Sequence, residues 1–116
     1  MTALAGLTVR WSLAGAGPEV EQELADYVAG TSHARFSVME GLRFKTWRMR
    51  SGEWFEGCYV FADDAARAQF QETFTATADT SPGSTIIGSS PILIEACTIV
   101  SVAEGASGFE PAPRFS

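Results

Sequence analysis

Residues 40–62 read EGLRFKTWRMRSGEWFEGCYVFA, and this stretch decides the fold. Two runs rich in aromatic and β-branched residues flank Ser51 and Gly52, which is the pattern of a β-hairpin. Gly52 can take the positive φ that such a turn requires, because it has no Cβ to clash. The sequence therefore predicts two antiparallel strands, at 42–50 and 53–62, joined by a two-residue turn.

A two-residue turn fixes which side chains share a face of this hairpin. Trp47 would then face Glu56, and Phe44 would face Tyr59. Because side chains alternate across a sheet, Phe44 and Tyr59 share one face. The opposite face carries charged and aromatic residues: Lys45, Trp47, Trp54 and Glu56. A solvated sheet face is normally polar, so we expect helices to cover the first face and a second copy of the chain to cover the other.

The rest of the chain supplies two more strands and two helices. Strict alternation predicts a strand at 7–13, and helical spacing of apolar residues predicts a helix that ends near Gly30. Asp63 is a helix N-cap before a second amphipathic helix. We expect a loop at 79–91 and a buried strand at 92–102. The order βαββαβ predicts a ferredoxin-like α+β fold, with an antiparallel sheet in the order 4-1-3-2 and both helices on one face.

The length of 116 residues argues for one domain. We expect residues 1–102 to form it and residues 103–116, rich in Gly, Ala, Ser and Pro, to form a C-terminal tail. Phe109 and Phe115 are two apolar anchors by which the tail could pack on the body or on a partner subunit.

The net charge of −6 disfavours nucleic-acid binding, which needs a basic surface. No apolar run approaches the ~18 residues of a membrane span, and the start of the chain lacks a signal-peptide pattern. We therefore expect a cytoplasmic protein. Cys58 and Cys97 would lie on strands separated by a third, so we expect free thiols. The single histidine gives no metal-site spacing, and we expect no metal or other cofactor.

The runs GLRFKTW (41–47) and EGCYVF (56–61), followed by Asp63, Ala65 and Ala68, resemble the YdhR-like mono-oxygenases. That group belongs to the dimeric α/β-barrel superfamily, which also holds the antibiotic-biosynthesis mono-oxygenases. The resemblance implies a homodimer whose two sheets pack face to face. Its interface would include the residues of the second hairpin face: Lys45, Trp47, Trp54 and Glu56.

The same resemblance implies oxygenation of a small phenol- or quinol-like substrate without a metal or flavin. His33 or Tyr59 would be the base. An aromatic pocket would be lined by Trp11, Tyr27, Phe44, Phe70 and Phe74. Simpler interpretations stay open, because His33 could be a solvated residue of an irregular segment at 31–39 and the aromatics could be ordinary core. The loop at 79–91 is either a lid or a plain connection.

The sequence thus favours two functions from different classes. The first is a cofactor-independent mono-oxygenase acting on a small aromatic substrate. The alternative is a non-catalytic homodimeric α/β barrel that binds a small apolar ligand or serves a structural role, because a fold alone does not determine a function. A ligand-sized cavity between sheet and helices, with a polar atom at its base, would favour the first.

Overall fold

The computed structural model describes residues 3–109. Four strands form one antiparallel sheet in the order β2-β3-β1-β4. The elements follow one another as β1 (Leu4–Ser12), α1 (Pro18–Tyr27), the π-helical turn η1 (Val28–Ser32), α2 (His33–Ser37), β2 (Leu42–Arg50), β3 (Trp54–Phe61), α3 (Asp64–Ala76), the 3-10 turn η2 (Ala78–Thr80), α4 (Pro82–Ile87) and β4 (Leu93–Ile99). This is the predicted ferredoxin-like α+β fold, with the predicted strand order.

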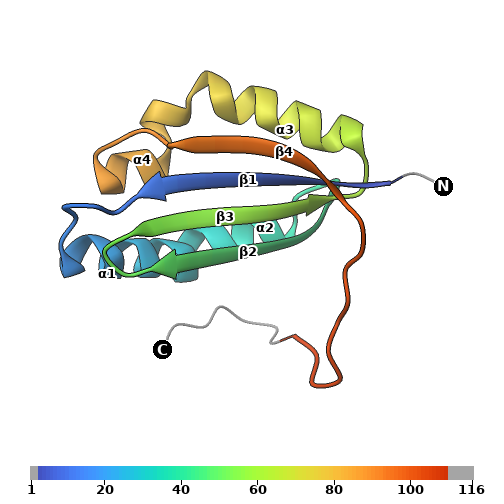
Figure 1. Ribbon diagram of the computed structural model, residues 1–116, viewed down its shortest axis with the longest axis horizontal. Coiled ribbons are helices and arrows are strands. Elements are labelled where there is room, and N and C mark those ends of the chain that lie inside the picture. Colours follow the sequence, from blue (N-terminus) through green and yellow to red (C-terminus); the bar gives the residue numbers. More distant parts are fainter. Residues whose placement is uncertain (1–2, 110–116) are drawn as a thin grey trace.

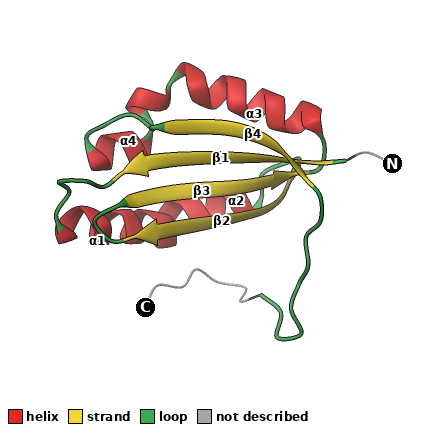
Figure 2. Cartoon of the chain, viewed as in Figure 1, coloured by secondary structure: helices red, strands yellow, loops and turns green. Residues whose placement is uncertain are grey.

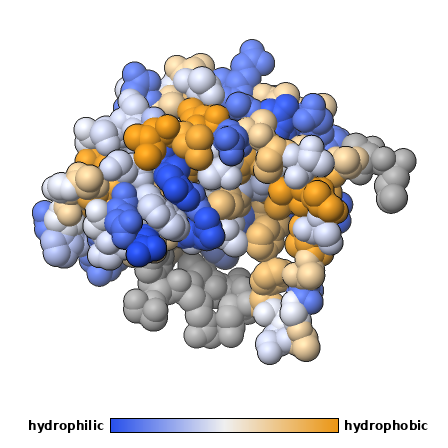
Figure 3. Space-filling view, in the orientation of Figure 1, coloured by the Kyte–Doolittle hydropathy of each residue, from blue (hydrophilic) through white to orange (hydrophobic). Residues whose placement is uncertain are grey.

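The helices gather on one face of the sheet. Figure 1 shows α1 and α2 behind the β2–β3 hairpin and α3 running along the β4 side, and Figure 2 shows the same layers by type. Among the described residues, no helix covers the face turned toward the viewer. Figure 3 shows that hydrophobic and hydrophilic side chains are mixed on this face, which we call the open face.

The register of the hairpin corrects the sequence analysis. Arg50 pairs with Trp54, so the turn contains residues 51–53, and Gly52 has φ +75°. A one-residue shift in register moves every side chain of a strand to the other face. The observed register turns Lys45 and Trp47 toward the helices and turns Arg48 and Arg50 toward the open face. It is favourable because it buries Trp and Met side chains in place of Arg.

The first helical segment is longer than the sequence predicts. Instead of ending near Gly30 and leaving 31–39 irregular, the chain continues through η1 into α2. Ser32 and Phe36 are buried by this continuation. The packing of these two buried residues against the rest of the fold outweighs the low helix propensity of Gly30. The Glu21 carboxylate also ties α1 to the hairpin, because it accepts a hydrogen bond of 2.8 Å from the Gly52 backbone N–H.

Local sequence explains the two helices that cover the β1–β4 half of the same face. The Asp63 carboxylate caps α3 by accepting a 2.8 Å hydrogen bond from the Ala66 N–H, as predicted. The segment 79–91, predicted as a loop, instead contains α4 and part of η2. Ser81 caps α4, with proline at the first helical position, and Gly88 ends it with φ +87°. This Ser-Pro start followed by glycine is the helix signal that the sequence analysis missed.

After β4 the described chain has no further helix or strand up to residue 109. The Phe109 ring lies 5.3 Å from the Phe44 ring, centroid to centroid, and Phe109 is largely exposed. The second predicted anchor, Phe115, and the rest of the tail from residue 110 lie outside the described residues. The division of the chain at residue 102 therefore stays a prediction.

Both cysteines are free, as expected, because β1 lies between the strands that carry Cys58 and Cys97. None of the helices in the part of the chain that the structure describes is long and apolar enough to cross a membrane. Residues 3–109 also hold no group of three His, Cys, Asp or Glu side chains placed to bind a metal ion.

Candidate functional site

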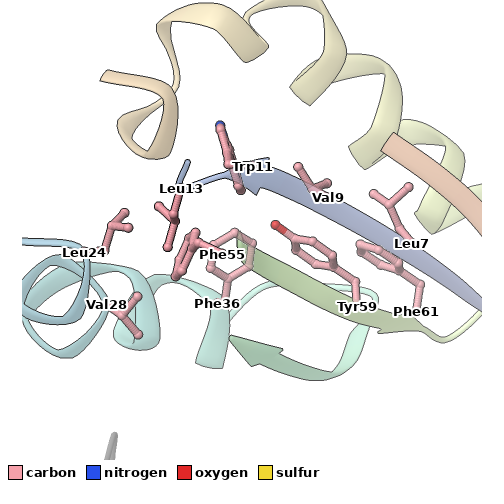
Figure 4. Packing of buried hydrophobic residues seen from close by; sticks show 10 residues of the cluster. All are labelled: Leu7, Val9, Trp11, Leu13, Leu24, Val28, Phe36, Phe55, Tyr59 and Phe61. Carbon is pink, nitrogen blue, oxygen red and sulfur yellow. The ribbon is translucent and has the colours of Figure 1, made fainter. Parts of the chain in front are cut away.

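A cavity of about 880 Å³ lies between the sheet and its helices. Pockets of this size accept a small organic ligand. Its aromatic lining comes from several elements: Trp11, Tyr27, Phe36, Trp47, Phe55, Tyr59, Phe61, Phe70 and Phe74. In Figure 4 the Tyr59 hydroxyl points into the space that Trp11, Phe36 and Phe55 surround. The sequence analysis names a ligand-sized cavity with a polar atom at its base as the feature that favours the enzymatic function.

Lys45 places its amine among the aromatic rings of this cavity. The Lys45 Nζ lies 3.3 Å from the ring centroid of Phe36, 4.4 Å from that of Trp47 and 4.3 Å from that of Tyr59. Within residues 3–109, no carboxylate forms a salt bridge with this amine. Lys45 is also the only lysine in the chain. The only lysine amine of the protein thus lies in the wall of its cavity.

The surroundings of Lys45 favour the neutral amine. Burial, and then the positive charge of Arg35, lower the pKa of Lys45 from 10.5 to about 6. The π faces of the three rings attract an ammonium ion and oppose this shift, but no carboxylate within residues 3–109 forms a salt bridge that would add to that attraction. At neutral pH the side chain is therefore able to accept a proton or to act as a nucleophile.

Tyr59 stands beside this amine with its hydroxyl protonated. Burial raises the pKa of the Tyr59 phenol well above its usual value, although the positive charge of Arg35 opposes the change. The phenol is therefore a hydrogen-bond donor at neutral pH. Gly57 leaves the space between the two groups open, because a Cβ there would lie 3.2 Å from the Lys45 Cε and 3.3 Å from the Tyr59 hydroxyl oxygen.

One end of the cavity is closed by α4. The Trp11 Nε1–H donates a buried hydrogen bond of 2.9 Å to the Ser84 hydroxyl, which donates one of 2.6 Å to the Ala78 carbonyl. Gly83 allows α4 to approach the indole ring, because a Cβ at that position would lie only 2.9 Å from it. This contact holds α4, in the segment expected to be either a lid or a plain connection, against the sheet as part of the cavity wall.

The structure brings together most of the predicted pocket residues. Trp11, Tyr27, Phe70 and Phe74 line the cavity, as does Tyr59, one of the two predicted bases. Phe44 does not, because the corrected register places it on the open face against the Phe109 ring.

His33, the other predicted base, begins α2 and lies outside the cavity lining. Its ring centroid is 6.0 Å from that of Trp47. The Trp47 indole lines the cavity, and His33 packs beside that indole without lining the cavity itself.

The predicted interface residues divide between the two faces of the sheet. Lys45 and Trp47 line the cavity, contrary to the sequence analysis, and the cause is again the one-residue change in register. Trp54 and Glu56 lie on the open face, as expected. Thr46 lies there with them, because it pairs with Cys58.

Within the part of the chain that the structure describes, Glu56 is the one fully buried charged residue on the open face. Its carboxylate accepts hydrogen bonds from Arg10 Nε at 2.8 Å and from Arg48 Nε at 2.6 Å. The Arg10 guanidinium also lies 4.5 Å from the Trp54 ring centroid. Burial alone would raise the pKa of Glu56, but the two arginines outweigh it and hold that pKa below its usual value. Glu56 is therefore ionised and neutralised within its own chain.

The residue that sequence reasoning missed is Lys45. Two signals could have identified it: it is the only lysine among eight basic residues, and it sits between two aromatic residues of the strand, Phe44 and Trp47. The arginines at 48 and 50 also predict the correct register, because burying them would have been unfavourable. With the strand turned accordingly, Lys45 falls on the helix-covered face.

Fold and cavity together define a ferredoxin-like α+β domain with an aromatic, amine-bearing pocket. No protein-family model and no curated protein sequence matches the chain. Among solved structures, it is similar to NE2512, a protein of unknown function from Nitrosomonas europaea, with 24% identity, coverage of 90% of this chain and 97% of that one, and a TM-score of 0.58.

A second similar structure is the mono-oxygenase from the gene ActVA-Orf6 of Streptomyces coelicolor, in complex with the ligand Nanaomycin D. It is 12% identical, with coverage of 90% of this chain and 94% of that one, and a TM-score of 0.53. At these identities both comparisons demonstrate a shared fold.

Proposed function

We propose that this protein is a cofactor-independent mono-oxygenase of the YdhR-like kind that acts on a small phenol- or quinol-like substrate. The observation that carries the proposal is the amine of Lys45, facing an aromatic cavity in which its neutral form is favoured. The shared fold with a structure described as a mono-oxygenase in complex with Nanaomycin D supports the choice of reaction.

In this proposal Lys45 is the base that takes the phenolic proton. A neutral amine becomes an ammonium ion as the substrate becomes a phenolate, so the pair gains an ionic attraction inside a poorly solvated pocket. Arg35 lines the same cavity and adds a second positive charge. The electron-rich phenolate then supplies electrons to O₂: one oxygen atom enters the ring, the other leaves as water with two hydrogens from the substrate, and the ring is oxidised to the quinone level.

Tyr59 serves as a hydrogen-bond donor in this scheme and not as the base. Because its pKa is raised, its hydroxyl keeps its proton and can donate to the substrate oxygen on which negative charge develops. The flat aromatic walls contributed by α3, including Phe70 and Phe74, hold the ring in place. Orientation of this kind is a large part of the rate gain that the protein can supply.

Oxygen consumption with a panel of quinols and hydroxynaphthalenes tests the proposal. Lys45→Met should lower kcat by roughly 10²-fold or more, because a general base contributes about 10²–10⁴ in rate. The matched control is His33→Ala, which lies outside the cavity lining and should keep kcat within about twofold. Turnover by Lys45→Met at the wild-type rate would contradict the role of the amine. Tight binding of the panel without oxygen uptake would support the ligand-binding alternative instead.

We further propose a homodimer in which the open faces of two copies pack together. The amphipathic character of that face supports it: Trp54 is half-buried between the guanidinium groups of Arg10 and Arg48, and Phe44 adds an apolar ring at the other end of β2. Light scattering should give twice 12.4 kDa at micromolar concentration. Trp54→Glu should shift the protein toward monomer, because it would place a carboxylate beside the already neutralised Glu56. A wild-type monomer would contradict the proposal.

A further inference from the structure

The cavity offers a covalent chemistry that oxygenation does not use. A lysine amine that faces a ligand-sized apolar cavity, without a carboxylate partner among the described residues, is the arrangement that carbonyl chemistry needs. An exposed lysine is almost wholly protonated at neutral pH and has no free electron pair. Burial lowers the pKa of Lys45, so its amine is largely unprotonated at neutral pH and has a free electron pair.

We propose that Lys45 is a nucleophile that captures aromatic aldehydes and unhindered aromatic ketones in the cavity as an imine. The proposal goes beyond the proposed function: it uses the same cavity but requires neither oxygen nor turnover of a phenol. The aromatic lining selects the ring, and the position of Nζ against Phe36 and Trp47 places the amine at the wall that such a ring would contact.

The step is balanced without any further reagent. The Lys45 nitrogen attacks the carbonyl carbon, a C–N bond forms, and the carbonyl oxygen becomes the hydroxyl of a carbinolamine. Loss of that hydroxyl with one proton from nitrogen releases water and leaves C=N in place of C=O. Addition of water in reverse returns the free amine and the carbonyl compound.

Tyr59 is placed to move the proton in this step. Its hydroxyl oxygen and the Lys45 Cε both lie within 3.3 Å of the position of a Cβ on Gly57, so the two groups share one corner of the cavity. As a protonated phenol, Tyr59 can donate a proton to the departing oxygen and recover one from the nitrogen. Because Gly57 has no side chain, the space between the two groups stays free for a carbinolamine; a larger residue at position 57 would fill that space.

The charges around the amine come from α2 and β3. Arg35 on α2 disfavours the ammonium, while the Cys58 thiol on β3 has only a weak opposing influence. The Tyr59 phenol also faces it, and Tyr27 of α1 influences Tyr59 in turn. Glu40 and Asp63 line the same cavity, but among residues 3–109 neither carboxylate forms a salt bridge with Lys45. Labelling of Lys45 should therefore change little between pH 7 and pH 8.

Reductive trapping of the wild-type protein tests the proposal directly. The full chain is incubated without oxygen at pH 7 with benzaldehyde and sodium cyanoborohydride, and intact mass and peptide mapping follow the product. We expect one benzyl group per chain, located at Lys45. Because the chain has a single lysine, the only other primary amine is the N-terminus, which lies on a different peptide. Modification confined to the N-terminal peptide would overturn the proposal.

A matched variant separates cavity chemistry from the ordinary reactivity of lysine. Lys45→Arg combined with Arg43→Lys keeps the composition and moves the amine to an exposed position on the same strand. We expect its lysine to be labelled at least about tenfold more slowly at pH 7, with the difference shrinking toward pH 10. Equal rates for the two lysines would overturn the proposal, as would labelling of Lys45 that an excess of 2-naphthol fails to slow.

The outcomes also separate this proposal from the proposed function. Trapping at Lys45 without quinol-dependent oxygen uptake would retain the imine and reject the mono-oxygenase. Oxygen uptake without trapping would retain the mono-oxygenase and reject the imine. Tyr59→Phe adds a further check, because it should slow trapping at Lys45 several-fold while the pH dependence stays that of the amine. An unchanged rate would remove Tyr59 from the step.

Discussion

Lys45→Met should make the protein more stable at pH 7, because it removes an amine that folding forces into its neutral form. Its pKa is lowered in the folded state, so the unfolded chain holds the Lys45 proton more tightly and protonation favours unfolding. The change from 10.5 to about 6 corresponds to roughly 6 kcal/mol of unfavourable free energy once the pH is below 6. At pH 7 the same reasoning gives a ceiling of about 5 kcal/mol.

The expected gain is smaller than this ceiling, because the aromatic rings favour the ammonium and the amine reaches the cavity. We expect Lys45→Met, which nearly conserves volume, to raise the free energy of unfolding by about 2–3 kcal/mol at pH 7. Protonation penalises wild-type folding fully below the folded pKa, and the penalty is lost as the pH rises toward 10.5. The advantage of the variant should therefore fall by up to about 1.4 kcal/mol per pH unit on the alkaline side.

Urea unfolding followed by tryptophan fluorescence, at half-unit steps from pH 6.5 to 9.5, measures this difference. The matched control is Arg43→Met, which removes one positive charge from an exposed position on the same strand and should change stability by less than about 0.5 kcal/mol. A variant less stable than wild type at pH 7 would refute the reasoning. So would a difference between variant and wild type that does not vary with pH.

Two further substitutions test the Trp11–Ser84 hydrogen bond and the buried ion pairs of Glu56. Trp11→Phe deletes the buried hydrogen bond to Ser84 and should lower the free energy of unfolding by about 1–2 kcal/mol; an unchanged urea midpoint would mean that this bond does not hold α4. Glu56→Gln should destabilise by about 1–2 kcal/mol at pH 7, discounted because its partner Arg48 is 56% exposed. Because the pKa of Glu56 is lowered by folding, its stabilisation is present above about pH 4.5 and is lost in acid. The curves of wild type and variant should therefore converge as the pH falls below 4.5, and a constant gap would contradict this.

The sequence predicts the topology well because topology rests on strong, repeated signals. The period-2 run of β1, the hairpin pattern of β2 and β3, and the Asp63 cap are each local, and each agrees with the final structure. The helix continuing past Gly30 could not be read locally, because it depends on burying Phe36 against the sheet. Tertiary packing therefore determines where this helical segment ends.

The candidate site was harder to predict, because it depends on a single residue of register. A turn of residues 51–53 moves Lys45 and Trp47 to the cavity and Phe44 away from it. Residues contributed by other elements, such as Trp11 and Phe70, line the cavity whichever register the hairpin takes, because their faces do not depend on that turn. The amine in the cavity wall was missed because its face does depend on the turn.

The most direct measurement of the central claim is the titration of the single lysine. Labelling with [ε-¹³C]lysine gives one NMR resonance from Lys45, and its chemical shift reports the charge of the amine. The account predicts a midpoint well below that of free lysine, toward pH 6, and a shift of the resonance when a quinol or 2-naphthol fills the cavity under nitrogen. A midpoint near 10.5 with no response to these ligands would show an ordinary solvated lysine and would contradict the account.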